Sequence, residues 1–120
     1  MNKQLEIALT GRRPVIVSTD KWEIIARYSD HDEQHYTNSN RFYFACVRQH
    51  SDGRCIVYAT YKTNLSEEYD YAAGEKVDSL DDVPDAIFRV VDQMNWHRRI
   101  ADQLIANLPP EELDKNETAA

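Results

Sequence analysis

The chain has 120 residues, of which 42% are hydrophobic and 29% charged, and 21 acidic residues against 14 basic ones give a net charge of −7. This length fits one domain, and the hydrophobic content excludes a disordered chain. The negative charge disfavours nucleic acid as a partner, because phosphate backbones are bound by basic surfaces.

The compartment is predicted from what the sequence lacks. The N-terminus has no apolar run of the kind a secretory signal needs, and no stretch approaches the ~20 apolar residues of a membrane span. The two cysteines, Cys46 and Cys55, do not form a disulfide framework and are interpreted as small buried hydrophobic residues. We therefore expect a cytoplasmic protein that does not insert into membranes.

The first part of the chain predicts a short helix followed by two strands. Residues 3–10 carry apolar side chains at helical spacing and are followed by Gly11, which favours a short helix. The β-branched run 15–17 predicts a short strand. Alternation of apolar and polar residues over 21–28 predicts a second, half-exposed strand.

The strongest local signal is a β-hairpin. Residues 41–49 and 54–62 read as two strands joined by Asp52-Gly53, a dipeptide typical of tight hairpin turns. A two-residue loop would place Cys46 opposite Ala59.

Both faces of this predicted hairpin are apolar. One face carries Phe42, Phe44, Cys46, Val57, Ala59 and Tyr61, and the other carries Tyr43, Ala45, Val47, Ile56, Tyr58 and Thr60. The second face is too apolar to stand in water, so we expect something to cover at least part of it.

The last part of the chain predicts one long helix. Residues 63–80 are polar and irregular, whereas apolar residues spaced by three and four over about 83–108 predict an amphipathic helix that Pro109-Pro110 ends. At 1.5 Å per residue such a helix is ~39 Å long, so it either bends near Asn95 or extends past the sheet.

These elements predict an α+β fold. We expect a single domain over 1–110, in which an antiparallel sheet of three to four strands (about 15–17, 21–28, 41–49 and 54–62) packs against the long C-terminal helix (about 83–108), with the short N-terminal helix in addition. Residues 111–120 are expected to form a polar, flexible tail.

No catalytic residue, metal ligand or cofactor site is predicted. His31 and His35 are four residues apart, but Asp32 stands where the HExxH metalloprotease motif has its glutamate, and the string lies in a polar connection. There is no GxSxG motif, and three isolated glycines cannot build a phosphate-binding loop. We therefore expect a protein that is not an enzyme.

The remaining candidates are surfaces. The acidic, tyrosine-bearing stretch 66–71 suits a basic protein partner, because tyrosines provide rigid contact area. The second hairpin face would suit self-association. The residues expected to contact a partner are Tyr43, Val47, Tyr58, Glu67, Glu68, Tyr69, Asp70 and Tyr71.

The favoured interpretation is a small, acidic, protein-binding accessory module, an inhibitor or regulator of the kind that mobile elements encode. Its partner would be another protein or a second copy of the chain, as a homodimer. The alternative is a small-molecule-binding or catalytic α+β domain with a pocket between sheet and helix near His97. That pocket would be lined by Trp22, Phe44, Tyr61 and His97.

A third interpretation, nucleic-acid binding, draws on basic residues that form no single run. They are Arg12, Arg13, Arg41, Arg48, Arg54, Lys62, Arg98 and Arg99. Those near the hairpin would form a local patch, but the net charge opposes this function.

Overall fold

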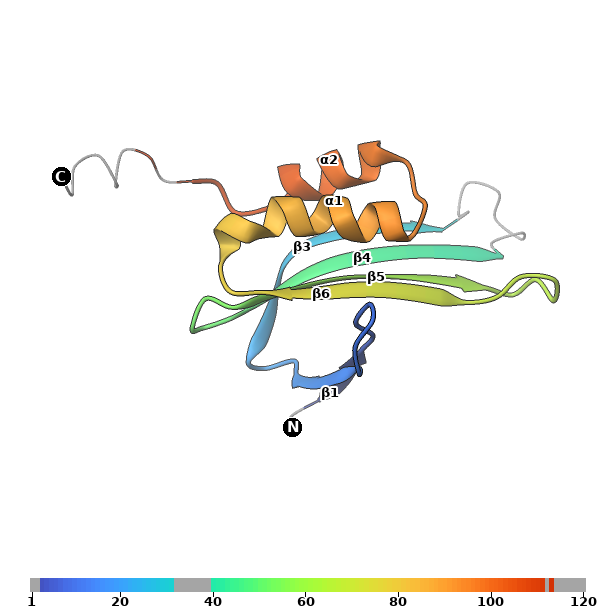
Figure 1. Ribbon diagram of the computed structural model, residues 1–120, viewed down its shortest axis with the longest axis horizontal. Coiled ribbons are helices and arrows are strands. Elements are labelled where there is room, and N and C mark those ends of the chain that lie inside the picture. The colour runs from blue at the N-terminus through green and yellow to red at the C-terminus, as the bar shows by residue number, and fades with distance from the viewer. Residues whose placement is uncertain (1–2, 32–39, 112, 114–120) are drawn as a thin grey trace.

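A computed structural model describes residues 3–31, 40–111 and 113, with the backbone alone at residues 30 and 31 (Figure 1). The strands are β1 (Gln4–Ile7), β2 (Val15–Ser18), β3 (Trp22–His31), β4 (Arg41–His50), β5 (Cys55–Thr63) and β6 (Tyr71–Val77). A 3-10 turn, η2 (Leu80–Asp82), leads into helices α1 (Val83–Gln93) and α2 (Arg98–Ala106). The fold of the described residues is α+β, as expected.

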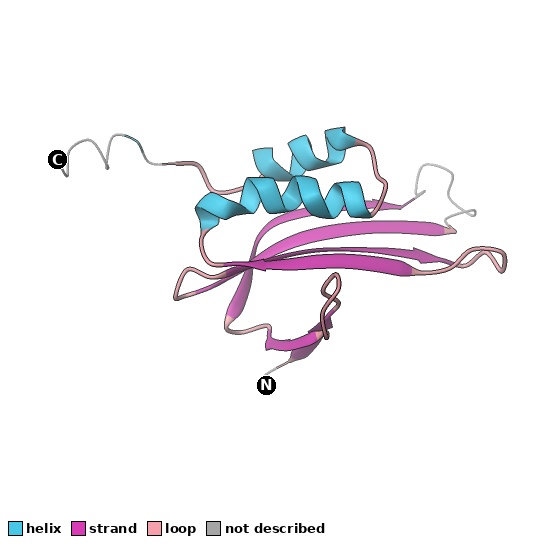
Figure 2. Cartoon of the chain, in the orientation of Figure 1, coloured by secondary structure: helices cyan, strands magenta, loops and turns pink. Residues whose placement is uncertain are grey.

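The described residues form three layers. Strands β3-β4-β5-β6 make an antiparallel four-stranded sheet in that order, and β1 and β2 pair in a separate two-stranded sheet. The two helices cover one face of the large sheet and the β1–β2 hairpin lies against the other, as Figures 1 and 2 show. We call these faces the helix side and the hairpin side.

The expected set of strands in the large sheet is wrong at its first and last members. Residues 15–17 belong to the small sheet with β1, and the fourth strand is β6, which falls within 63–80, a stretch expected to be irregular. The sequence of β6 is Tyr-Ala-Ala-Gly-Glu-Lys-Val, in which alanine and glycine are poor strand formers. Pairing with β5 decides its conformation instead.

The short helix expected over 3–10 is also wrong, because this segment contains β1. Leu5 and Ile7 alternate with the exposed residues Gln4 and Glu6, and Ile7 and Leu9 are buried against the large sheet. The apolar residues of this segment fit a period of two as well as a helical period. Packing against the large sheet favours the strand conformation over the helix.

The single long C-terminal helix is replaced by two short helices. The break lies at Asn95, whose φ of 59° is the left-handed conformation that ends helices and that asparagine tolerates. Trp96 N donates to the Val91 carbonyl at 3.1 Å, which closes the end of α1. The apolar stripe continues past the break because Ile100 and Leu104 of α2 enter the same core as α1.

The β4–β5 turn contains three residues, 51–53, rather than two. His50 N donates to the Arg54 carbonyl at 2.9 Å, and Gly53 has a φ of 100°, as in a three-residue hairpin loop with a glycine bulge. Cys46 therefore pairs with Tyr58 and not with Ala59. A shift of one residue turns every β5 side chain to the other face.

The corrected register redistributes the apolar residues. The helix side carries Tyr43, Ala45, Val47, Cys55, Val57, Ala59 and Tyr61, and the hairpin side carries Phe44, Cys46, Ile56 and Tyr58. The expected second face does not exist as one surface, because its β4 residues lie on the helix side and its β5 residues on the hairpin side. The chain itself covers both sides, with α1 and α2 on the helix side and the β1–β2 hairpin on the hairpin side. Ile7, Leu9 and Val17 of the β1–β2 hairpin pack there.

The hairpin is also tied to the edge of the large sheet. Thr10 N donates to the Gly74 carbonyl at 2.9 Å, Gly74 N donates to Thr10 Oγ1 at 3.1 Å, and that hydroxyl donates to Gln93 Oε1 at 2.7 Å. A Cβ atom on Gly74 would lie 2.2 Å from the Ala8 carbonyl oxygen, so only glycine allows this approach. None of the helices within the described residues has the length and apolar character needed to cross a bilayer.

Candidate functional site

Three of the residues expected to contact a partner lie in the interior. Val47 is fully buried and Tyr58 is 6% exposed, and they face opposite sides of the sheet. Tyr43 is half-buried between the rings of Tyr61, at 5.0 Å, and Trp96, at 5.5 Å. These side chains stabilise the core, so the face expected to mediate self-association is not a free surface.

The other five expected residues lie together, four in the loop between β5 and β6 and Tyr71 at the start of β6. We call residues 64–70 the Tyr69 loop. Its anchor is Glu68, whose carboxylate receives hydrogen bonds from Arg41 Nη2 at 2.8 Å, Tyr61 Oη at 2.5 Å and Thr63 Oγ1 at 2.9 Å. Arg41 Nε also donates to Glu68 Oε1 at 3.3 Å, so both carboxylate oxygens are bound and the ion pair is bidentate.

These donors change the acid–base properties of the cluster. The hydrogen bonds from Arg41, Tyr61 and Thr63 lower the pKa of Glu68 from 4.5 to about 2. The same ion pair raises the pKa of Arg41. Burial, followed by the contact with Glu68, raises the pKa of Tyr61. The loop is therefore anchored by a carboxylate that stays ionised well below neutral pH.

Backbone hydrogen bonds complete the shape of the Tyr69 loop. Asn64 N donates to the Asn40 carbonyl at 2.9 Å, and Thr63 N donates to Asp70 Oδ1 at 2.9 Å. Leu65 N donates to Thr63 Oγ1 at 3.0 Å, which makes a local turn at the end of β5. Both ends of the loop are thus fixed to the sheet.

Two tyrosines present their rings to solvent from this fixed frame. Tyr69 is 86% exposed, the largest exposure among the large hydrophobic residues of the described chain. Tyr71 is 44% exposed, stacks on Tyr61 at 4.9 Å and donates a hydrogen bond to the Met94 carbonyl at 3.4 Å. The neighbouring residues Glu67 and Asp70 are exposed acids, so the surface is aromatic and negatively charged.

The sequence placed Glu68 in the contact surface but missed the residues that hold it. Arg41 and Thr63 are register partners at the open end of the β4–β5 hairpin, and Tyr61 is two residues away on the same strand. Arg41 and Thr63 are equally far from the β4–β5 turn, so their proximity was predictable from the sequence. A carboxylate in the following loop is within reach of all three.

The residues of the alternative pocket do not share a cavity. Trp22 and Phe44 pack on the hairpin side, whereas Tyr61 belongs to the helix-side core. His97 is exposed at the start of α2, where its Nδ1 accepts a hydrogen bond from Arg99 N at 3.0 Å. This histidine therefore caps a helix.

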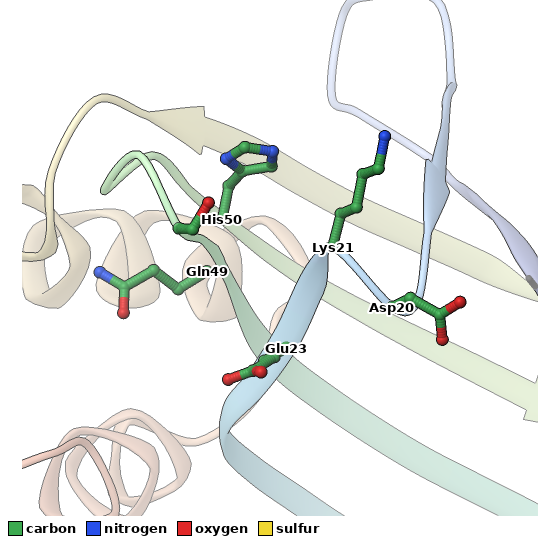
Figure 3. A pocket seen from close by; sticks show the side chains of 6 residues that line it. Asp20, Lys21, Glu23, Gln49 and His50 are labelled. Carbon is green, nitrogen blue, oxygen red and sulfur yellow. The ribbon is translucent and has the colours of Figure 1, made fainter.

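A hollow of about 470 Å³ lies beside the β4–β5 turn (Figure 3). It is lined by Asp20, Lys21, Glu23, Gln49, His50 and Ser51. Glu23 and Gln49 are register partners, as are Trp22 and His50 one position earlier, so Glu23 and His50 point to opposite faces. The lining charges are mixed and do not converge on one point.

The chemistry of the β4–β5 turn is explained by its structure. His50 Nδ1 accepts a hydrogen bond from Asp52 N at 3.1 Å, and the Asp52 carboxylate accepts from Arg54 N at 3.0 Å and Arg54 Nε at 2.8 Å. The bond from the Arg54 backbone is the main reason that the pKa of Asp52 is lowered. These contacts close the hairpin.

The cysteines and histidines give no further site within the described residues. Cys46 and Cys55 are free, and burial raises the pKa of both thiols, which lowers their reactivity. No group of three or more histidine, cysteine, aspartate or glutamate side chains among these residues could hold a metal ion. His35 and the side chain of His31 lie outside the described residues.

Comparison of the chain with protein-family models, with curated proteins and with solved structures finds no match.

Proposed function

We propose that this protein is an accessory module that acts by binding another protein through the Tyr69 loop. The observation that carries the proposal is the 86% exposure of Tyr69 on a loop fixed by the Glu68 ion pair. Here the frame that presents it is already ordered, so binding does not have to order it.

The chemistry of the loop defines the partner. An aromatic side chain held in a fixed frame loses little conformational entropy on binding, and tyrosine is one of the residues that dominate binding energies at interfaces. Glu67 and Asp70 add negative charge on either side of Tyr69. A protein with a basic patch around a shallow apolar recess complements this surface, and the net charge of −7 would speed the encounter.

A homodimer is a special case of the proposal. Two apolar features of the sequence favoured self-association, but the residues of the expected face are covered by the helices or by the β1–β2 hairpin, and the long stripe is divided between α1 and α2. The Tyr69 loop is still accessible to a second copy. Because two such loops are both acidic, we favour a different, basic protein and an inhibitory or regulatory role in the cytoplasm.

The experiment compares three tagged proteins in a host lysate: the wild type, Tyr69→Ala, and Ile16→Ala as the matched control. Ile16 is 64% exposed on β2, in the layer opposite the helices, and so provides an exposed apolar side chain away from the loop. We expect a protein that the wild type and Ile16→Ala retain and that Tyr69→Ala loses. Equal retention by all three proteins would refute a role for the loop.

A further inference from the structure

Three cations on one face of the large sheet have no acidic partner among the described residues. On the helix side, Arg41 pairs with Glu68 and Arg89 pairs with Glu75. On the hairpin side, Arg27, Arg48 and Lys62 form no ion pair with any carboxylate of the described residues. The net charge of −7 therefore hides a local group of unpaired cations on this face, beside the Arg54–Asp52 ion pair of the turn.

Arg48 is the best defined of these cations. It is half-buried on β4, its Nε donates to Tyr58 Oη at 2.9 Å and its Nη1 donates to the Trp22 carbonyl at 2.8 Å. Both partners are neutral, so the guanidinium is fixed in position while its charge stays uncompensated. A partly desolvated cation held in this way favours an anion next to it.

A groove of about 300 Å³ runs beside Arg48, between β1 and the large sheet. Its lining includes Glu6, Phe44, Arg48, Tyr58, Thr60 and Lys62. Phe44 is half-buried and packs against Tyr58 with their ring centroids 6.1 Å apart. The groove thus combines an aromatic ring, two cations and two hydroxyl-bearing side chains.

The arrangement of these groups follows the strands. Lys62 is the register partner of Phe42, six residues from Arg48 along β4, which corresponds to roughly 20 Å at strand rise. Phe44 lies between them on the same face, and Arg27 of β3 pairs with Cys46 of the same face. A chain of negative charges running along the strands would meet the cations with an aromatic ring in between.

We propose that this part of the hairpin side binds a single strand of nucleic acid, with phosphates at Arg48, Lys62 and Arg27 and a base stacked on Phe44. Sheet faces that carry aromatic and basic side chains bind single strands by stacking and by contacts to the backbone. An acidic peptide would satisfy the cations but would leave the aromatic ring without a flat partner.

Binding at this face is weak and strongly salt-dependent. Three cations set the number of phosphate contacts, and the acids elsewhere on the chain repel the strand. Glu6 lines the same groove and opposes an anion directly. Neutralising Glu6 should therefore increase the affinity for an anionic ligand. The affinity for an apolar or cationic ligand would not increase.

The test is fluorescence anisotropy with a labelled oligothymidylate of about ten nucleotides, which is within the site sizes of single-strand-binding domains. The variants are Arg27→Gln/Lys62→Gln and, as the control with the same change in charge, Arg98→Gln/Arg99→Gln on α2. All four side chains are exposed, so the folds should be kept. At about 0.1 M salt each lost phosphate contact weakens single-strand binding roughly fivefold.

We expect the Arg27/Lys62 variant to bind roughly 25-fold more weakly and the control to stay within about twofold of the wild type. Glu6→Gln should bind more tightly, and Phe44→Leu, which keeps an apolar side chain but removes the aromatic ring, more weakly. The absence of binding at low salt, or an equal loss in both double variants, would overturn the proposal. Equal competition by poly-glutamate would assign the face to acidic proteins instead.

Discussion

The contact between Gly74 and the β1–β2 hairpin allows a sharp test of the three-layer arrangement. In Gly74→Ala the new Cβ atom would lie 2.2 Å from the Ala8 carbonyl oxygen and 3.3 Å from Leu9 Cδ2. The clashing atom belongs to the backbone and cannot rotate out of the way, so the hairpin must move away from β6. The perturbation is thus a single methyl group that acts on one interlayer contact.

The expected loss follows from what the movement breaks. The two hydrogen bonds between Thr10 and Gly74 contribute about 1 kcal/mol each. Partial exposure of Leu9, which is 7% exposed in place, adds about 1 kcal/mol. Alanine is better than glycine in a strand by up to about 1 kcal/mol, which offsets part of the loss. The free energy of unfolding should therefore fall by about 2 kcal/mol.

Urea unfolding followed by tryptophan fluorescence measures this difference. The control is Ala72→Ser, an exposed residue of the same strand that faces the same side, which should change the stability by less than about 0.5 kcal/mol. A Gly74→Ala protein as stable as the wild type, or more stable, would show that the hairpin does not lie against β6 as described.

Two further predictions concern the loop anchor and the helix cap. Because the pKa of Glu68 is about 2 in the folded protein against an ordinary 4.5, its ionised form stabilises the fold above pH 4.5, and this contribution disappears as the pH falls towards 2. Glu68→Gln should flatten that part of the stability profile, measured by urea unfolding between about pH 5 and 2; an unchanged slope would contradict the role of the ion pair with Arg41. His97→Ala should destabilise the protein by about 1 kcal/mol through loss of the hydrogen bond from Arg99 N, and His97→Asn should restore most of it. Equal stabilities of the two His97 variants in thermal unfolding would show that the cap is unimportant.

The sequence identified the elements whose signals are local. The two strands around Asp52-Gly53 were predicted within two residues at each end, because alternating apolar residues and a turn dipeptide act together there. The register was not predictable, since the same dipeptide serves two-residue and three-residue loops. The hydrogen bond from His50 N to the Arg54 carbonyl and the φ of Gly53 identify the three-residue loop.

Elements decided by tertiary packing were missed. Strand β6 contains Ala72, Ala73 and Gly74, whose small side chains give no strand signal but permit the hairpin to approach. Strand β1 read as a helix because Leu5 and Leu9 fit either period. A bend near Asn95 was one of two alternatives for the expected long helix, but the continuous apolar stripe hid the end of α1 there, since α1 and α2 share one core.

The candidate site was partly visible for a related reason. An exposed acidic segment with tyrosines stands out in composition, so Tyr69 and its neighbours were identified. The hydrogen bonds that hold Glu68 depend on Arg41, which is 27 residues away in the sequence. The pairing of β4 and β5 brings Arg41 into this contact. The same pairing buries Val47 and Tyr58, which a sequence pattern alone left on a surface.

The central claim is that Tyr69 touches a protein partner, and site-specific photo-crosslinking tests it most directly. A benzophenone amino acid is placed at Tyr69 in one protein and at Asp102, an exposed residue of α2, in another. After irradiation in host cells, we predict a discrete covalent adduct from position 69 and none of the same mass from position 102. No adduct at position 69, or the same adduct at both positions, would contradict the proposed binding surface.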